Sequence, residues 1–357
     1  MSGARSPNGG GLFFCVRVIL RAALELTRKI ATCAAMQCPP AEWFPQRTVY
    51  TAFPSHADLW EDDLQPARVQ VMDMARALSR TVPVRMLAAN GSSASEARKM
   101  AGDARIDILE IAFGDIWLRD TTPLFMSPAL GHAFRFNGWG GKYALPGDDS
   151  VGAAVGSDAA AEIVHHDFVL EGGSIDGDGS GLFVTTEQCL LNPNRNGSID
   201  HKDIENILRE ALGVRRLIWL GEGLHNDHTD GHIDNLARFA APGTLLIPVP
   251  AGPDDPNAAI YADAHRRAQH AGVVVLDMPS VGRFEQDGEL VPASYMNFVI
   301  ANGQVVVPLY GAPNDENAIK MLKKAFPRHA VTGLPANHIL TGGGSFHCIT
   351  QQVPEAK

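Results

Sequence analysis

Apolar positions downstream of residue 60 follow either the period of a helix or the short runs typical of buried strands. The helical period is clearest in four residues spaced three apart: Val69, Met72, Ala75 and Leu78. Because residues three and four apart share one face of a helix, this pattern predicts a helix over 64–80, and Pro66 suits its first turn. Shorter apolar runs predict strands at 82–87 and 106–111.

One unit, an apolar hairpin followed by a helix and a further strand, recurs along the rest of the chain. It is predicted over 236–276, where a Pro-Gly pair breaks the hairpin, and again over 296–332, where the hairpin turns at an Asn-Gly pair. An earlier copy is predicted over 182–220, with its hairpin at 182–191. The predicted helices of these units are 203–212, 257–270 and 315–326. Because repeated units bury their apolar faces against one another, we expect a single catalytic domain over 36–357.

The first 35 residues differ from the rest. Their apolar stretch, 12–26, is interrupted by Arg17 and Arg21, and it is too short and too charged to span a membrane. An arginine inside the apolar stretch is also unusual for a signal peptide. We therefore expect residues 1–35 to be an N-terminal extension, disordered or outside the functional protein, with Met36 opening the catalytic domain.

The composition is that of a packed, acidic protein. Hydrophobic residues make up 45% and charged residues 20%, and 40 acidic against 30 basic residues give a formal net charge of -10. No block of lysine and arginine interleaves with aromatic residues, so neither nucleic acid nor a membrane is an expected partner, whereas an acidic field attracts cations. The five cysteines show no paired CxxC spacing. This favours a reducing compartment, the cytoplasm, over a disulfide framework or a zinc ribbon.

The segment richest in histidine and aspartate spans 225–235, HNDHTDGHIDN. Its histidines and acids could ligate the metal of a metal-dependent hydrolase, although the chain has no HExxH motif. The candidate ligands are His225, Asp227, His228 and His232. In an extended chain His232 and Asp234 would lie on one face, where they could equally form a base and an anchor for a cation. On this segment alone both interpretations stay open.

A second segment, 341–351, has three consecutive glycines ahead of Cys348. Glycines allow unusual backbone angles and close approach, which could expose the cysteine at a tight site. No lysine follows them, so the segment is not a Walker-type phosphate loop. A lone cysteine is more often a small buried residue than a nucleophile. Its neighbours His347 and Thr350 keep the catalytic interpretation open.

Two further segments each carry an acidic residue, Asp120 in GDIWLRDTTP and Glu171 in LEGGSI. Taken singly, Asp120 is explained by an ion pair with a nearby arginine and Glu171 by a turn. Together with His232, Asn297 and Cys348, however, these residues recur at intervals of 51, 61, 65 and 51 residues, about one for each repeated unit. This spacing predicts that one loop from each unit reaches a shared central site.

Six motifs, in this order, resemble the agmatine deiminase and bacterial peptidyl-arginine deiminase family. They are WLRDTTP (117–123), FNGWGGKY (136–143), LEGGSID (170–176), TDGHIDN (229–235), YMNFVIANG (295–303) and GGGSFHCITQQ (342–352). The opening PPAEWFPQRTVYTAFPSH (39–56) is similar to the start of the family, so the resemblance runs from about residue 36 to the C-terminus. The family is part of the guanidine-modifying superfamily. The resemblance therefore implies an α/β fold, a five-bladed pseudo-symmetric propeller built from ββαβ units.

The resemblance also implies roles for individual residues. Cys348 would be the nucleophile, His232 the general acid and base, and Glu171 a further contact that holds the substrate and His232. The implied substrate-binding residues are Asp120, Asp234 and Trp117. Thr122 stands where the family usually has glycine, so the loop that binds the substrate is expected to differ in shape.

The implied reaction is the hydrolysis of a guanidine, with agmatine as the best-matching substrate. A guanidinium is planar and always protonated, so paired carboxylates can balance its charge and orient it. A thiolate attacks the guanidinium carbon, ammonia leaves, and water then releases N-carbamoylputrescine. No metal or organic cofactor is required. A peptidyl-arginine deiminase with the same residues is the alternative within the family, and a homo-oligomer is compatible with either.

Overall fold

The computed structural model describes residues 38–356, whose strands form five sheets of three or four strands and one two-stranded hairpin. In four of the sheets the first two strands are antiparallel, the third lies parallel to the middle strand, and a helix connects these last two. Their strands are β4 Leu124–Ser127, β5 Leu130–Arg135, β6 Glu162–Val169, β7 Ile175–Gly177, β8 Leu182–Thr186, β9 Arg216–Leu220, β10 Arg238–Ala241, β11 Thr244–Val249, β12 Val274–Pro279, β15 Val299–Ala301, β16 Gln304–Leu309 and β17 Ala330–Pro335. The connecting helices are α7 Asp148–Asp158, α10 His201–Leu212, α11 Ala258–His270 and α12 Asp315–Ala325.

The remaining large sheet joins the two ends of the described chain, in the order β18-β1-β2-β3. Strand β18 (Thr350–Pro354) runs antiparallel to β1 (Gln46–Ala52), and the other two strands continue the sheet in parallel. Those strands are β2 Val84–Ala88 and β3 Ile106–Glu110, and the connecting helices are α3 Leu64–Leu78 and α4 Gly91–Ala101. Because β18 pairs with β1, the segment that carries Cys348 is fixed beside the start of the described chain.

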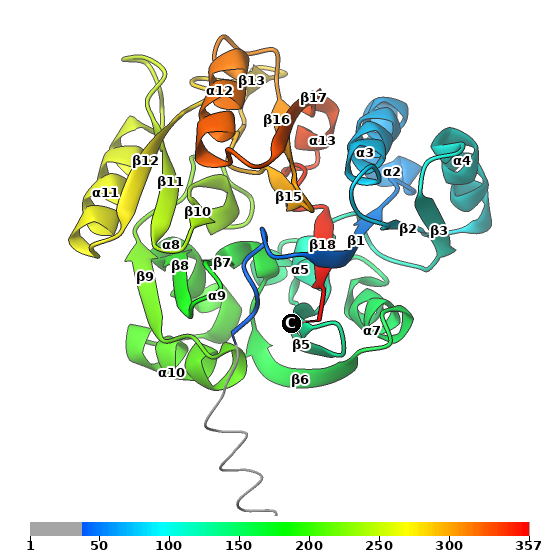
Figure 1. Ribbon diagram of the computed structural model, residues 1–357, viewed down its shortest axis with the longest axis horizontal. Helices are drawn as coiled ribbons and strands as arrows, with labels where there is room; N and C mark the ends of the chain where they lie inside the picture. Colours follow the sequence, from blue (N-terminus) through cyan, green and yellow to red (C-terminus); the bar gives the residue numbers. More distant parts are fainter. Residues whose placement is uncertain (1–37, 357) are drawn as a thin grey trace, which may run out of the picture. The chain divides into compact units, whose positions relative to one another are not determined.

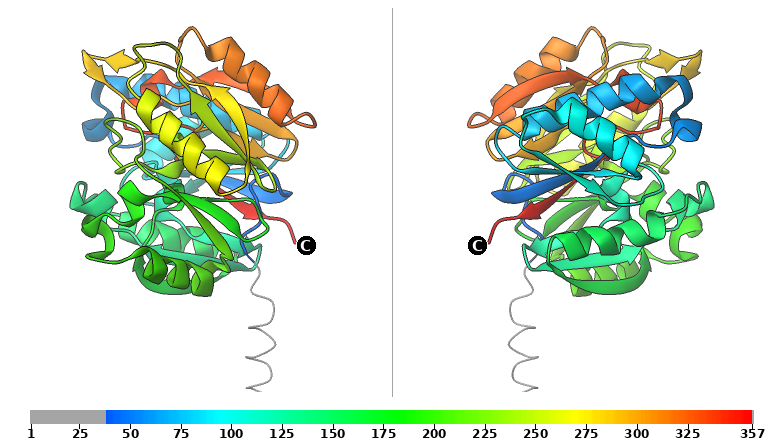
Figure 2. Two further views of the ribbon diagram at one scale, coloured as in Figure 1. Left: turned by 90° about the vertical axis from the view of Figure 1, so that its left-hand side faces the viewer. Right: turned by 90° about the vertical axis from the view of Figure 1, so that its right-hand side faces the viewer.

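The helices lie outside the sheets. Figure 1 shows α7, α10, α11 and α12 at the periphery of the described body and β1, β7, β15 and β18 nearer its middle. Figure 2 shows α11 on one side of this body and α4 on the opposite side. Short helices occupy the inner loops: α5 (Leu118–Thr121) packs against η2 (Gly172–Ser174), which packs against η3 (Ile233–Asn235). The segments that carry the sequence motifs therefore meet between the sheets.

The two hairpins predicted from Pro-Gly and Asn-Gly pairs are present. Gly243 connects β10 to β11 with a φ of 66°, and Gly303 connects β15 to β16 with a φ of 76°. These left-handed backbone angles are strained for most residues but not for glycine. Hence the turn residues fixed the positions of both hairpins.

The hairpin predicted at 182–191 is wrong. Only β8 is a strand in this range, because Glu187–Leu190 form the short helix α8. The side chain of Thr186 accepts a hydrogen bond from the Cys189 N–H at 3.3 Å and so caps this helix. The partner of β8 is the upstream strand β7.

Helix α4 was not predicted, since its sequence is rich in serine and alanine. Asn90 begins it by accepting a hydrogen bond from the Ser93 N–H at 3.0 Å. The other short elements are α2 Ala57–Trp60, η1 Glu61–Asp63, α6 Gly138–Gly141, α9 Pro193–Asn196, α13 Asn337–Leu340, β13 Glu285–Gln286 and β14 Glu289–Leu290. Within residues 38–356, no helix combines the length and the apolar character needed to cross a membrane. The extension predicted at 1–35 lies outside the described residues.

Candidate active site

A pocket of about 220 Å³ lies between the loops that carry the sequence motifs. Its apolar and aromatic wall is formed by Leu59, Trp117, Trp139, Tyr143 and Leu145. Asp120, Cys348 and the three glycines that precede this cysteine also line it. Trp117 thus lies in the wall of the same pocket as Cys348, the expected nucleophile.

Cys348 lies in the turn before β18 and is only 5% exposed. The side-chain amide of Asn297 holds it from two directions. Its Nδ2 donates to the sulfur at 3.0 Å, and its Oδ1 accepts from the Cys348 N–H at 3.2 Å. Burial, and then the charges of Asp234 and Asp120, raise the pKa of the Cys348 thiol well above its usual value. Without a bound cation, the thiol is therefore protonated.

The glycines beside Cys348 are required by close packing. A β-carbon on Gly344 would lie 2.6 Å from the Trp117 ring and 3.2 Å from the Cys348 sulfur. A β-carbon on Gly342 would likewise lie 2.6 Å from the Trp117 ring. The glycine run therefore lets the backbone pass between the indole and the thiol.

Asp120 lies in the short helix α5. Its Oδ1 accepts from the Gly173 N–H and its Oδ2 from the indole N–H of Trp139, both at 2.9 Å. Burial raises the pKa of Asp120, while the charge of His232, 3.8 Å away, opposes the rise. The carboxyl group lies at the pocket and has neither lysine nor arginine as an ion-pair partner among the described residues.

His232 and Glu171 lie behind Asp120, and both are fully buried. Glu171 Oε1 accepts from Arg195 Nε at 2.7 Å, in an ion pair between two side chains that are themselves fully buried. Burial opposes protonation of His232, but the charge of Asp120 and the nearby side chains of Cys189 and Glu171 outweigh it and raise its pKa well above the usual value. A histidine held protonated in this way can donate a proton.

Asp234 is fully buried in the 3₁₀ turn η3, so the extended conformation predicted for 232–234 is wrong. Its Oδ2 accepts from His347 Nδ1 at 2.7 Å and lies 3.5 Å from the Cys348 sulfur. Burial opposes its ionisation, but the hydrogen bond and charge of His347 outweigh burial and lower the pKa of Asp234. Despite the different backbone, Asp234 and His232 both reach the site.

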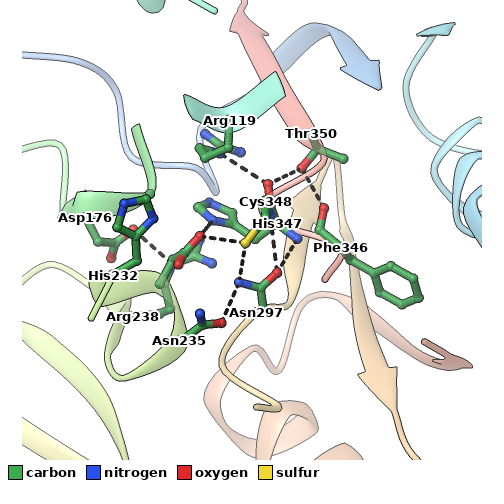
Figure 3. Close-up of polar contacts among 12 residues, drawn as sticks. Arg119, Asp176, His232, Asn235, Arg238, Asn297, Phe346, His347, Cys348 and Thr350 are labelled. Atoms are coloured by element: carbon green, nitrogen blue, oxygen red, sulfur yellow. Dashed lines mark hydrogen bonds and ion pairs between the residues drawn. The ribbon is translucent and has the colours of Figure 1, made fainter. Parts of the chain in front are cut away.

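A second layer of charged groups surrounds the site (Figure 3). His347 Nε2 lies 3.2 Å from Glu42, and Arg238 forms ion pairs with both Glu42 and Asp176. Burial raises the pKa of Glu42, but Arg238 and His347 reverse this effect and hold it well below its usual value. Arg119 donates to Gln351 Oε1 at 3.1 Å and does not line the pocket. This layer fixes the histidine that holds Asp234.

The histidine-rich segment does not gather into the metal centre considered for it. Asp227 accepts hydrogen bonds from Thr229 and Asn235, and His228 Nδ1 lies 2.9 Å from the Tyr143 hydroxyl at the pocket. Among residues 38–356, the one group with metal-ligand spacing consists of Glu171, Cys189 and His232. The metal alternative based on 225–232 therefore has no supporting geometry in the described part of the chain.

Thr122, the departure from the family pattern, has ordinary extended backbone angles, φ -116° and ψ 162°. Its hydroxyl donates to the Leu118 carbonyl. Threonine is accommodated here without strain, because these angles do not demand glycine.

The structure brings together the six residues proposed from the sequence and adds others to which the sequence analysis assigned no role in binding or catalysis. Asp120, Trp117 and Cys348 line the pocket, Asp234 contacts Cys348, and Glu171 and His232 lie behind Asp120. The additions are Trp139, Arg195, Asn297 and His347. Three of the four lie inside a sequence motif, and this position could have identified them as candidate site residues. Arg195 lies outside them all.

Known structures share this fold. An agmatine deiminase of Enterococcus faecalis superposes with a TM-score of 0.85 and 30% identity, covering 90% of this chain and 96% of that one. A variant agmatine deiminase of C. jejuni with substrate bound gives a TM-score of 0.83 and 28% identity, covering 89% and 96% of the two chains. The fold and the pocket therefore define a protein of the deiminase class.

Sequence comparison identifies the family within that class. The agmatine deiminase of Stutzerimonas stutzeri is 38% identical over 361 residues, which cover 88% of this chain and 95% of that protein. The sequence profile of the Porphyromonas-type peptidyl-arginine deiminases matches residues 38–354. This chain belongs to the Porphyromonas-type peptidyl-arginine deiminase family. The resemblance read from the six motifs is thereby confirmed.

Proposed function

We propose that this protein hydrolyses agmatine to N-carbamoylputrescine and ammonia. The observation that carries the proposal is the pair of buried carboxylates, Asp120 and Asp234, beside a buried thiol. Like charges in a confined, water-poor site repel each other, so such a pair suits a cationic ligand. The aromatic wall fits the aliphatic chain of the substrate, and relatives of similar length are agmatine deiminases.

The carboxylates would bind the guanidinium and place its carbon at Cys348. Asp234 has one buried oxygen, Oδ1, without a hydrogen-bond partner among residues 38–356, and this oxygen is available for a guanidinium N–H. A cation bound between the two carboxylates would offset their negative charges, which together with burial raise the pKa of the Cys348 thiol. Substrate binding itself would then favour the thiolate.

His232 would transfer the protons in both halves of the reaction. The thiolate of Cys348 forms a bond to the guanidinium carbon, and proton donation by His232 lets the C–N bond break with release of ammonia. His232 next takes a proton from water, whose oxygen bonds to the same carbon. The carbon–sulfur bond then breaks, which returns the thiolate and leaves the ureido product. Glu171, fixed by Arg195, would hold His232 and the substrate in place.

We further propose that 36–357 is a single catalytic domain and that its five sheets are the blades of an α/β propeller. The recurrent antiparallel pair followed by a parallel strand supports this arrangement, and β18 paired with β1 would complete the first blade. The proposed reaction needs no metal or organic cofactor. Cytoplasmic location and a homo-oligomeric state stay predictions.

Product analysis with purified protein tests the function. We expect ammonia and N-carbamoylputrescine from agmatine, and no turnover by Cys348→Ser, because a serine hydroxyl is a much weaker nucleophile here. A thiol-directed mass label should fall on Cys348 in preference to the fully buried Cys189, and agmatine should block it. Full turnover by Cys348→Ser, or labelling unchanged by agmatine, would remove Cys348 from the site. Release of ammonia from a peptide with a C-terminal arginine but not from agmatine would show that the substrate is peptidyl-arginine and not agmatine.

A further inference from the structure

Three potential metal ligands meet behind the pocket. Glu171 comes just before η2, Cys189 lies in α8 and His232 comes just before η3, so three separate segments of the chain supply them. One ligand atom from each residue lies within 4.8 Å of the other two, and all three residues are fully buried. A tetrahedral zinc ion, 2.0–2.3 Å from its ligands, spaces them roughly 3.5 Å apart. If the three ligand atoms moved toward one another by about an ångström, they could form three of the four bonds of a zinc ion.

We propose that Glu171, Cys189 and His232 form an inhibitory binding site for a divalent, thiolate-seeking cation, of which Zn²⁺ is the physiological example. The ligand types favour this class of ion, because thiolate, imidazole and carboxylate together suit Zn²⁺ and disfavour Mg²⁺ and Ca²⁺. The ion would have three protein ligands and one position open to water. It would occupy a ring nitrogen of His232 and so remove the group that moves protons in the proposed reaction.

The hydrogen bonding of these side chains leaves a polar atom available for a ligand. Glu171 Oε2 is buried without a hydrogen-bond partner among residues 38–356, and the imidazole of His232 has the Cys189 thiol as its neighbour. Arg195 binds the other carboxylate oxygen, Oε1, at 2.7 Å and thereby orients Oε2. Metal-bound carboxylates commonly have such a supporting hydrogen bond. Asp230, 2.5 Å from Arg195 Nη1, balances the guanidinium charge and lessens its repulsion of an ion.

Binding would exchange protons for the cation. Formation of the sulfur–zinc bond releases the thiol proton, and formation of the nitrogen–zinc bond releases the imidazolium proton. No electron is transferred. The onset of inhibition should be slow, because the fully buried site must open to admit the ion.

The inhibitory effect rests on the proposed function, but occupancy of the site does not. Co²⁺, which replaces Zn²⁺ and gives a thiolate-to-cobalt absorption band, is the probe for occupancy. We expect this band in the wild-type protein and in Cys348→Ser, and its loss in Cys189→Ser. This pattern would hold even if agmatine proved not to be the substrate. A band lost in Cys348→Ser and kept in Cys189→Ser would overturn the proposal.

Inhibition by Zn²⁺ provides the second measurement. The turnover of agmatine that Cys189→Ser shows, whatever its rate, should be at least tenfold less sensitive to Zn²⁺ than that of the wild type, whereas unchanged sensitivity would overturn the inhibitory role. If Cys189→Ser does not fold, crystals of Cys348→Ser soaked in Zn²⁺ decide the matter. Anomalous scattering should place the ion between Glu171, Cys189 and His232. An ion bound elsewhere, or none at all, would refute the site.

Discussion

The bond between His347 and Asp234 offers a direct test of how the outer charges control the site. Replacement of His347 by glutamine keeps a donor near Glu42 but removes the donor 2.7 Å from Asp234 Oδ2. Both partners are almost fully buried, and a hydrogen bond to a charged group such as the Asp234 carboxylate contributes roughly 1.5–3 kcal/mol. Since each 1.4 kcal/mol changes a rate by about tenfold, kcat/KM for agmatine should fall roughly 10- to 150-fold.

The pH profile separates this effect from simple misfolding. His347 holds the pKa of Asp234 low against the effect of burial, so the pKa of Asp234 should rise in His347→Gln. The ionised carboxylate that we propose as the guanidinium ligand would then be lost at higher pH than in the wild type. The deficit in kcat/KM should grow as the pH is lowered and shrink as it is raised. His347→Asn, whose amide nitrogen can occupy the position of Nδ1, should recover most of the activity.

The chain provides a matched control in His338, whose Nδ1 lies 2.6 Å from Asp63 in a partly exposed pair outside the pocket. His338→Gln should have wild-type kinetics, because solvent competes with that bond. An unchanged kcat/KM in His347→Gln would refute the reasoning. A loss of equal size at every pH would show that His347 does not act through the ionisation of Asp234.

The other predictions concern substrate choice and acid stability. Arginine adds an α-carboxylate to agmatine, and the side chains that line the pocket among the described residues include no lysine or arginine, so burial of this group unpaired should cost several kcal/mol. We expect kcat/KM for agmatine to exceed that for arginine roughly a thousandfold by ammonia release, and comparable values would contradict the agmatine assignment. Glu42→Gln should lower the free energy of unfolding by about 3–5 kcal/mol at pH 7 in urea titrations, since it breaks a buried ion pair with Arg238. Because folding lowers the pKa of Glu42, its ionised carboxylate contributes full stability above the pKa of the unfolded chain, and this contribution declines below that pKa. The difference in unfolding free energy between the wild type and Glu42→Gln should therefore narrow from about pH 4.5 downward. A difference that stays constant with pH would contradict the role of the Glu42 charge.

Much of the fold could be predicted because turn chemistry and apolar periodicity agree over long stretches. Helices α10, α11 and α12 begin and end within a few residues of their predicted limits, and the hairpins at Gly243 and Gly303 are where their turns placed them. The failures are short elements. Helices α5 and α8 have four residues each, too few for a periodic signal. Helix α5 packs against the distant η2, and in α8 the side chain of Gln188 accepts a hydrogen bond from the distant Gly223 N–H.

The same distinction divides the site. Cys348, His232 and Asp234 could be proposed because each lies in a motif with unusual composition. Arg195 could not, because its pairing with Glu171 depends on how α9 packs in the folded chain. The backbone of 232–234 was also mispredicted, since alternation of polar and apolar residues does not distinguish a strand from a 3₁₀ turn.

The distribution of arginines explains how one protein can hold so many buried carboxylates and still bind a cation. Glu42 and Asp176 share Arg238, and Glu171 has Arg195, so these acids are neutralised by fixed cations. Among the described residues, Asp120 and Asp234 pair instead with histidines and have no arginine or lysine as a partner. Their negative charge is left for a ligand beside Cys348, where it also keeps the thiol protonated until that ligand binds. An arginine beside either aspartate would improve the stability of the empty site, but it would remove both the affinity for a guanidinium and the coupling between binding and thiolate formation that we propose.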